Sequence, residues 1–112
     1  MDQAGYSQKK LLIVAHRVHE ALKDNNLTHS FLGGLEMIVL GAPRLTKDVD
    51  VEVKRQFFSR NNLKTIKEAF SDTNVFRVLD GTRNDGFRML CKCSDIDDET
   101  NAEWIGVDVL TR

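Results

Sequence analysis

The sequence lacks a strong net charge, long apolar runs and a cysteine-rich segment. Its net charge is only −1, so no overall basic field favours nucleic-acid binding. Its apolar runs are far shorter than the ~20 residues that a membrane-spanning helix needs. Two cysteines and three histidines are too few and too scattered to favour a zinc site.

What remains is the composition of an ordinary globular domain. With 112 residues, 41% of them hydrophobic and 29% charged, the chain is long enough for one core. We expect a single domain over residues 1–112, with residues 1–6 as a flexible tail. The apolar segment behind Lys9 and Lys10 is too short for a signal peptide, and His16 interrupts it. The sequence therefore predicts a cytoplasmic protein with no membrane contact.

The cysteines and histidines have positions that favour structural or surface roles. Cys91 and Cys93 are two residues apart, so on a strand they would point the same way, and such neighbours rarely form a disulfide. We expect reduced, mostly buried thiols. His16 and His19 lie on a predicted helix without acidic or cysteine partners at ligand spacing, which favours surface or boundary positions.

Hydrophobic periodicity predicts an α+β fold. A helix from residue 7 to about 25 carries Leu11, Val14 and Val18 at helical spacing, and Asn25-Asn26 ends it. A second helix, capped by Ser59 or Asn61, runs to about residue 71. Alternation and turn residues predict strands at about 28–32, 48–54, 74–79, 86–93 and 103–110. We expect a mixed, mainly antiparallel sheet with helices packed on one face.

Residues 31–54 carry the strongest functional signal. Gly33-Gly34 separate a strand from a short apolar helix at 35–40, and glycines there allow backbone N–H groups to approach an anion. A tight turn without a ligand remains the alternative. Asp48 and Asp50 would share one face of the next strand, opposite three valines. Asp is a poor strand residue, and two carboxylates suit Mg²⁺, although a solvated acidic face is also possible.

Asp108 supplies a third carboxylate, in the middle of the last predicted strand. Ile105, Val107 and Val109 alternate toward one face of that strand, which leaves Asp108 on the other. By itself Asp108 fits a surface residue as well as a site residue. Beside Asp48 and Asp50 it would complete a metal site and could act as a general base.

These motifs together resemble the core of the nucleotidyltransferase superfamily, to which DNA polymerase β belongs. The matching segments are FLGGL at 31–35 and LGAPRLTKDVDV at 40–51, with VDVL at 107–110 as the later strand. The Arg-x-Thr-x-Asp-x-Asp form is similar to the stand-alone, abortive-infection-like branch of small transferases.

The resemblance implies a role for each matching residue. Asp48, Asp50 and Asp108 would bind two Mg²⁺ ions, and Asp108 would also serve as the general base. Gly33, Gly34, Arg44 and Thr46 would form the nucleotide site: the glycines beside the triphosphate, Arg44 on a phosphate, and Thr46 on a phosphate or ordering the loop. The implied reaction transfers a nucleoside monophosphate from an NTP to an acceptor hydroxyl or phosphate, with pyrophosphate leaving.

The sequence also departs from the family pattern. Gly34 stands where many active members have serine, and Asp108 lies four residues before the last residue. Relatives usually continue into helices that bind the base or the acceptor. Either a second copy or a partner protein supplies those parts, or this sequence is a piece of a longer chain. The alternative to an enzyme is a catalytically inactive nucleotide-binding or protein-interaction module on the same fold. The acceptor, whether a small molecule, an RNA or a protein, stays open.

Overall fold

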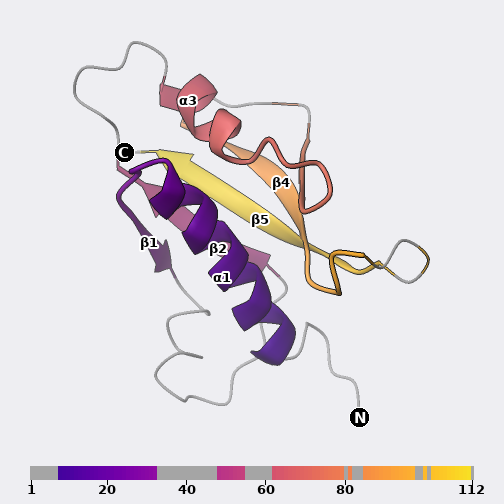
Figure 1. The fold of residues 1–112 in the computed structure, drawn as a ribbon. Coiled ribbons are helices and arrows are strands. Elements are labelled where there is room, and N and C mark those ends of the chain that lie inside the picture. Colours follow the sequence, from indigo (N-terminus) through magenta and orange to yellow (C-terminus); the bar gives the residue numbers. More distant parts are fainter. Residues whose placement is uncertain are drawn as a thin grey trace.

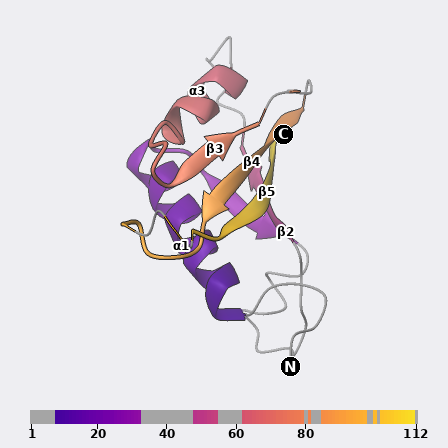
Figure 2. The same ribbon diagram turned by 90° about the vertical axis from the view of Figure 1, so that its right-hand side faces the viewer.

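The chain forms a five-stranded sheet with helices on one side of it (Figures 1 and 2). The computed structural model describes residues 8–32, 48–54, 62–79, 81, 85–97, 100 and 102–111. The predicted tail at 1–6 and the predicted short helix at 35–40 lie outside these residues. The elements are α1 (Gln8–Asp24), β1 (His29–Leu32), β2 (Asp48–Val53), α3 (Asn62–Ala69), β3 (Phe76–Val78), β4 (Gly86–Lys92) and β5 (Trp104–Thr111).

The strand order is β1-β2-β5-β4-β3. β2 and β5 are parallel, whereas the pairs β1–β2, β4–β5 and β3–β4 are antiparallel. The predicted α+β fold, with a mixed and mainly antiparallel sheet, is therefore confirmed. Among the described residues, no helix is long and apolar enough to cross a membrane.

The core lies between the sheet and the two described helices. α1 contributes the stripe that its helical spacing predicts, and α3 adds Ile66, with Phe70 just beyond its end. The central strands contribute every second residue, which is the pattern expected where one sheet face is buried. These buried strand residues are Val49, Val51 and Val53 of β2, Phe87, Met89 and Cys91 of β4, and Ile105, Val107 and Val109 of β5.

The end of α1 follows from its two asparagines. Asn26 has a φ of 57°, the left-handed conformation that asparagine tolerates better than most residues. The amide of Leu27 then donates a 2.9 Å hydrogen bond to the carbonyl of Leu22, which closes the helix. The chain can therefore turn directly into β1 and bring His29 back over α1.

β3 begins later than the sequence predicts, because a turn occupies the first residues of the predicted strand 74–79. The amide of Asn74 donates to the Asp72 side chain at 3.0 Å, and the amide of Val75 donates to the Asp72 carbonyl. These bonds use backbone groups that a strand ladder would need. The strand therefore begins at Phe76.

Candidate functional site

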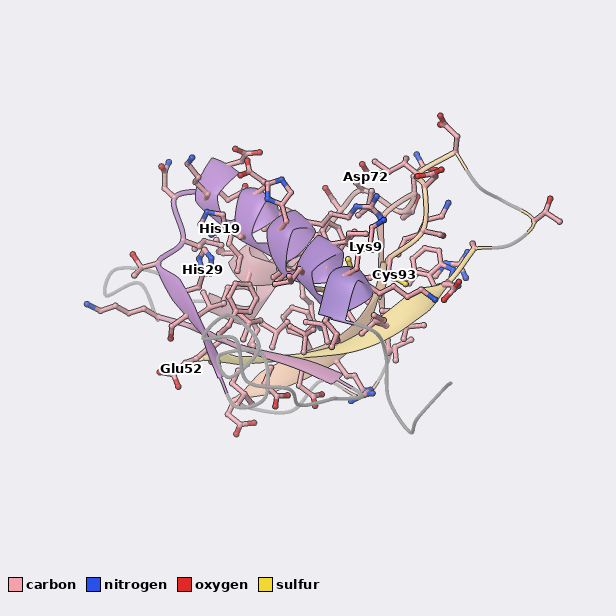
Figure 3. The ribbon with its side chains drawn as sticks, turned by 90° about the horizontal axis from the view of Figure 1, so that it is seen from below. Lys9, His19, His29, Glu52, Asp72 and Cys93 are labelled. Carbon is pink, nitrogen blue, oxygen red and sulfur yellow. The ribbon has the colours of Figure 1, made fainter. Side chains whose placement is uncertain are left out.

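The face of the sheet that points away from the helices carries a row of charged side chains at its centre. Asp50 of β2 is paired with Asp108 of β5, and these two aspartates form the carboxylate row. Asp108 is also paired with Arg88 of β4. Residues directly opposite in adjacent strands point to the same face. Figure 3 shows Glu52, two residues after Asp50, pointing away from the side of the sheet that α1 covers.

The hydrophobic pattern of the two parallel strands fixes this arrangement. Val49 is paired with Val107 and Val51 with Val109, and all four side chains are fully buried. A slip of one residue in either strand would move these valines to the other face of the sheet. The same register that buries the valines therefore places Asp50 and Asp108 side by side on the opposite face.

The two carboxylates are close enough to act together. Paired positions in adjacent strands lie ~4.7–4.9 Å apart, which is compatible with ligands to metal ions ~3.5–4 Å apart. Asp50 and Asp108 are both partly exposed, so a ligand can reach their side chains. The backbone of Asp48 is paired with Gly106 in the same ladder, but its side chain lies outside the described part of the structure.

Arg88 lies beside these carboxylates, and no sequence pattern predicted it as a site residue. Its Nη1 donates to Oδ1 of Asp108 at 3.1 Å, and both side chains are partly exposed. The alternation of β4 predicted only that Arg88 faces away from the core. Its partner depends on β4 lying next to β5, which no local pattern indicates. Arg88 orients the Asp108 carboxylate and supplies positive charge beside it.

The pairing of Arg88 with Asp108 is supported by the close approach of β4 to β5 at the next residue pair on the same face, Gly86 with Leu110. A Cβ atom at Gly86 would lie 2.1 Å from the carbonyl oxygen of Val109. Only glycine fits this position unless the backbone moves, so Gly86 lets β4 lie flat against β5. Two residues later, the same register brings Arg88 opposite Asp108.

The predicted nucleotide-binding residues are outside what the structure describes. These are Gly33, Gly34, Arg44 and Thr46. Leu32, which precedes the glycine pair in the chain, is paired through its backbone with Asp50. The described strand thus ends beside the carboxylate row.

Mg²⁺ is the metal that the carboxylate row suits. Asp50 and Asp108 offer oxygen ligands on one face, and Mg²⁺ in proteins typically combines one or two carboxylates with substrate phosphates. Among the described side chains, no group of three or more His, Cys, Asp or Glu could hold a metal ion. A metal site here would need ligands from outside the described side chains.

The two cysteines are free and buried, as predicted. Burial raises the pKa of Cys91 from 9.0 to about 12, and it also raises the pKa of Cys93. Both residues therefore lack the thiolate character of a nucleophile.

We expect Cys91 of the folded protein to resist alkylation at pH 8. Its thiolate fraction is about 1,000-fold lower than that of a thiol with the ordinary pKa, and burial blocks access as well. Mass spectrometry after timed iodoacetamide treatment would measure this, with the protein in guanidinium chloride as the control. Alkylation of Cys91 at the same rate in both samples would contradict its burial.

No protein-family model matches the sequence, and a search of the curated proteins finds no match. The case for a functional site therefore depends on the pairing of Asp50 with Asp108 and on the motif between residues 31 and 54.

Proposed function

We propose that the protein is a Mg²⁺-dependent nucleotidyltransferase that moves a nucleoside monophosphate from an NTP to an acceptor hydroxyl or phosphate. The observation that carries this proposal is the register of Asp50 with Asp108 on β2 and β5. Like charges directly opposite each other destabilise a sheet, and Asp is a poor strand residue. A shared ligand of positive charge would offset the repulsion between the two carboxylates, in addition to the ion pair that Asp108 makes with Arg88.

Each carboxylate has a defined task in this reaction. Asp50 and Asp108, with Asp48, would hold Mg²⁺ against the nucleotide phosphates. Bound there, Mg²⁺ would offset the charge that develops on the phosphate oxygens. Asp108 would accept the proton of an acceptor hydroxyl. The hydroxyl oxygen would then form a bond to the α-phosphorus while the bond from the α-phosphorus to pyrophosphate breaks. Gly33, Gly34, Arg44 and Thr46 would bind the triphosphate. An NTP substrate also agrees with the cytoplasmic location that the sequence predicts.

One observation favours the inactive alternative. Arg88 already supplies a positive charge to Asp108 at 3.1 Å. In a scaffold that binds nucleotides or a protein, this ion pair could balance the charge of the carboxylate row, and no metal would be needed. The ion pair is partly exposed, so its contribution to stability is small and it would yield readily to a stronger ligand.

Calorimetry and a pyrophosphate assay separate the two functions. The wild-type protein is titrated with each of the four common NTPs, with and without Mg²⁺, and pyrophosphate release is followed with candidate acceptors. Binding that depends on Mg²⁺ together with pyrophosphate release supports the enzyme. Nucleotide binding without release in any acceptor condition supports the inactive module. The absence of Mg²⁺-dependent heat would remove the main support for the enzyme, and the absence of any heat with NTP, with or without Mg²⁺, would exclude nucleotide binding by the inactive module as well.

A further inference from the structure

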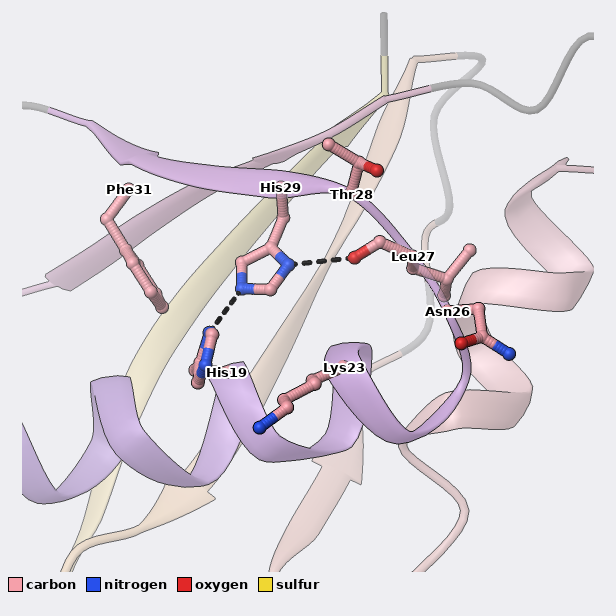
Figure 4. A pocket seen from close by; sticks show the side chains of 7 residues that line it. All are labelled: His19, Lys23, Asn26, Leu27, Thr28, His29 and Phe31. Atoms are coloured by element: carbon pink, nitrogen blue, oxygen red, sulfur yellow. Dashed lines mark hydrogen bonds between the residues drawn. The ribbon is translucent and has the colours of Figure 1, made fainter.

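A pair of histidines joins α1 to the edge strand β1 (Figure 4). His29 is paired with Val53, whose side chain points into the core, so His29 lies on the helix-covered face. Nδ1 of His19 and Nε2 of His29 are 2.9 Å apart. The two imidazoles line an open pocket together with Lys23, Asn26, Leu27, Thr28 and Phe31.

The backbone selects the tautomer of His29. Its Nδ1 lies 2.9 Å from the carbonyl oxygen of Leu27, which can only accept a hydrogen bond. Nδ1 therefore carries the proton, and in the neutral ring Nε2 presents its lone pair to His19. Metal-binding histidines are commonly oriented in this way, with the other ring nitrogen donating to a backbone carbonyl.

The spacing of the two nitrogens suits a shared metal ion. Two metal–nitrogen bonds of ~2.0–2.1 Å at a right angle span ~2.9 Å, and at a tetrahedral angle they span ~3.3 Å. The observed 2.9 Å separation is that of a hydrogen bond, which Nδ1 of His19 donates to Nε2 of His29. Because this distance equals the first of these values, a bound metal ion would take the place of the shared proton. His19 is exposed, so its ring can turn its Nδ1 toward a metal and carry its proton on Nε2 instead, facing water.

The rest of the pocket restrains His29 more than His19. The ring of Phe31 stands edge-on to His29, with centroids 5.8 Å apart, and limits rotation of that ring. The ammonium of Lys23 opposes a cation, but Lys23 is exposed and has a flexible stem that can turn away.

We propose that His19 and His29 form a two-histidine site for a divalent late transition metal ion such as Ni²⁺ or Zn²⁺, with water in the remaining positions. Imidazole nitrogen suits these ions, whereas Mg²⁺ prefers oxygen ligands, so this site is separate from the carboxylate row. No local pattern predicted this site, because His19 and His29 are ten residues apart in the chain and meet only when β1 packs on α1.

The test is calorimetric titration of the untagged protein with Ni²⁺ and with Zn²⁺. We expect one ion per chain, and His19→Ala should weaken binding by at least ~10-fold, as loss of one of two ligands requires. His16→Ala is the matched control, because it removes an exposed histidine from the same helix and should leave the affinity unchanged. Ni²⁺ or Zn²⁺ should also raise the melting temperature, since the site exists only in the folded chain. The same concentration of Mg²⁺ should change the melting temperatures of wild type and His19→Ala equally.

Three results would overturn the proposal. Equal affinity of wild type and His19→Ala for Ni²⁺ and Zn²⁺ would show that His19 and His29 do not bind the ion together. Equal losses in His19→Ala and His16→Ala would place the ion on the helix surface between those two residues. Stabilisation by inorganic phosphate that Lys23→Ala removes, without stabilisation by either metal, would make the pocket an anion site. Binding of Ni²⁺ or Zn²⁺ that Lys23→Ala leaves intact or strengthens supports the histidine site.

Discussion

Asp50→Asn is expected to remove Mg²⁺-dependent NTP binding and to lower pyrophosphate release by about 100-fold or more, the scale of losing one preorganised stabilising group. Asparagine keeps the shape of the side chain and removes its charge, so the strand should persist while the metal loses an anionic ligand. Calorimetry with NTP and Mg²⁺ measures the first effect, and the pyrophosphate assay measures the second.

Glu52→Gln is the matched control for this change. Glu52 lies on the same strand and the same face as Asp50, but its paired residue is Leu110 instead of a carboxylate. The control removes the same charge and should leave nucleotide binding intact. If Glu52→Gln lowers binding as much as Asp50→Asn does, the effect is one of general charge and the paired-carboxylate site is wrong.

The double variant Asp50→Asn/Asp108→Asn tests whether the two carboxylates act as one site. Residues that share a ligand are strongly non-additive, because the first substitution already removes most of what the second could. We therefore expect the double variant to bind NTP and Mg²⁺ no more weakly than the worse single variant. Losses that multiply in the double variant would show two independent roles and contradict a shared metal.

Local patterns in the sequence predicted most of the fold correctly. All five strands and both described helices occur within a few residues of their predicted bounds. The clearest case is β2, where the alternation of valine with acidic residues permits only one buried face. Because Val107 and Val109 repeat that alternation in β5, the sequence also indicated correctly which face of each strand would carry Asp50 and Asp108.

Contacts between segments that are distant in the chain could not be predicted from the sequence. The ion pair of Arg88 with Asp108 depends on the order of the strands, and the contact of His19 with His29 depends on how β1 returns over α1. Arg17 is a third example, because its guanidinium binds the carbonyls of Lys92 and Ser94 at the end of β4. Each of these polar side chains looks like an ordinary surface residue until the tertiary fold supplies its partner.

The largest stability effect is expected from Phe70→Ala, which should lower the free energy of unfolding by about 3–5 kcal/mol. Phe70 is 2% exposed and meets Phe76 of β3 and Phe87 of β4 edge-on, at centroid distances of 5.0 and 6.3 Å. Its removal would leave a cavity between α3 and the β3–β4 side of the sheet. Since a domain of this size is stable by only about 5–15 kcal/mol, equilibrium urea unfolding should show a much lower midpoint.

Two control variants separate packing at Phe70 from hydrophobicity in general. Phe70→Leu keeps most of the apolar volume but loses the edge-on ring contacts, so its loss should be clearly smaller than that of alanine. Leu12→Ala removes an apolar side chain that is 44% exposed on α1 and should change stability by about 0.5 kcal/mol or less. If Phe70→Ala were no more destabilising than Leu12→Ala, α3 would not anchor that side of the sheet. In that case, the register that sets Arg88 against Asp108 would depend on the β4–β5 ladder alone.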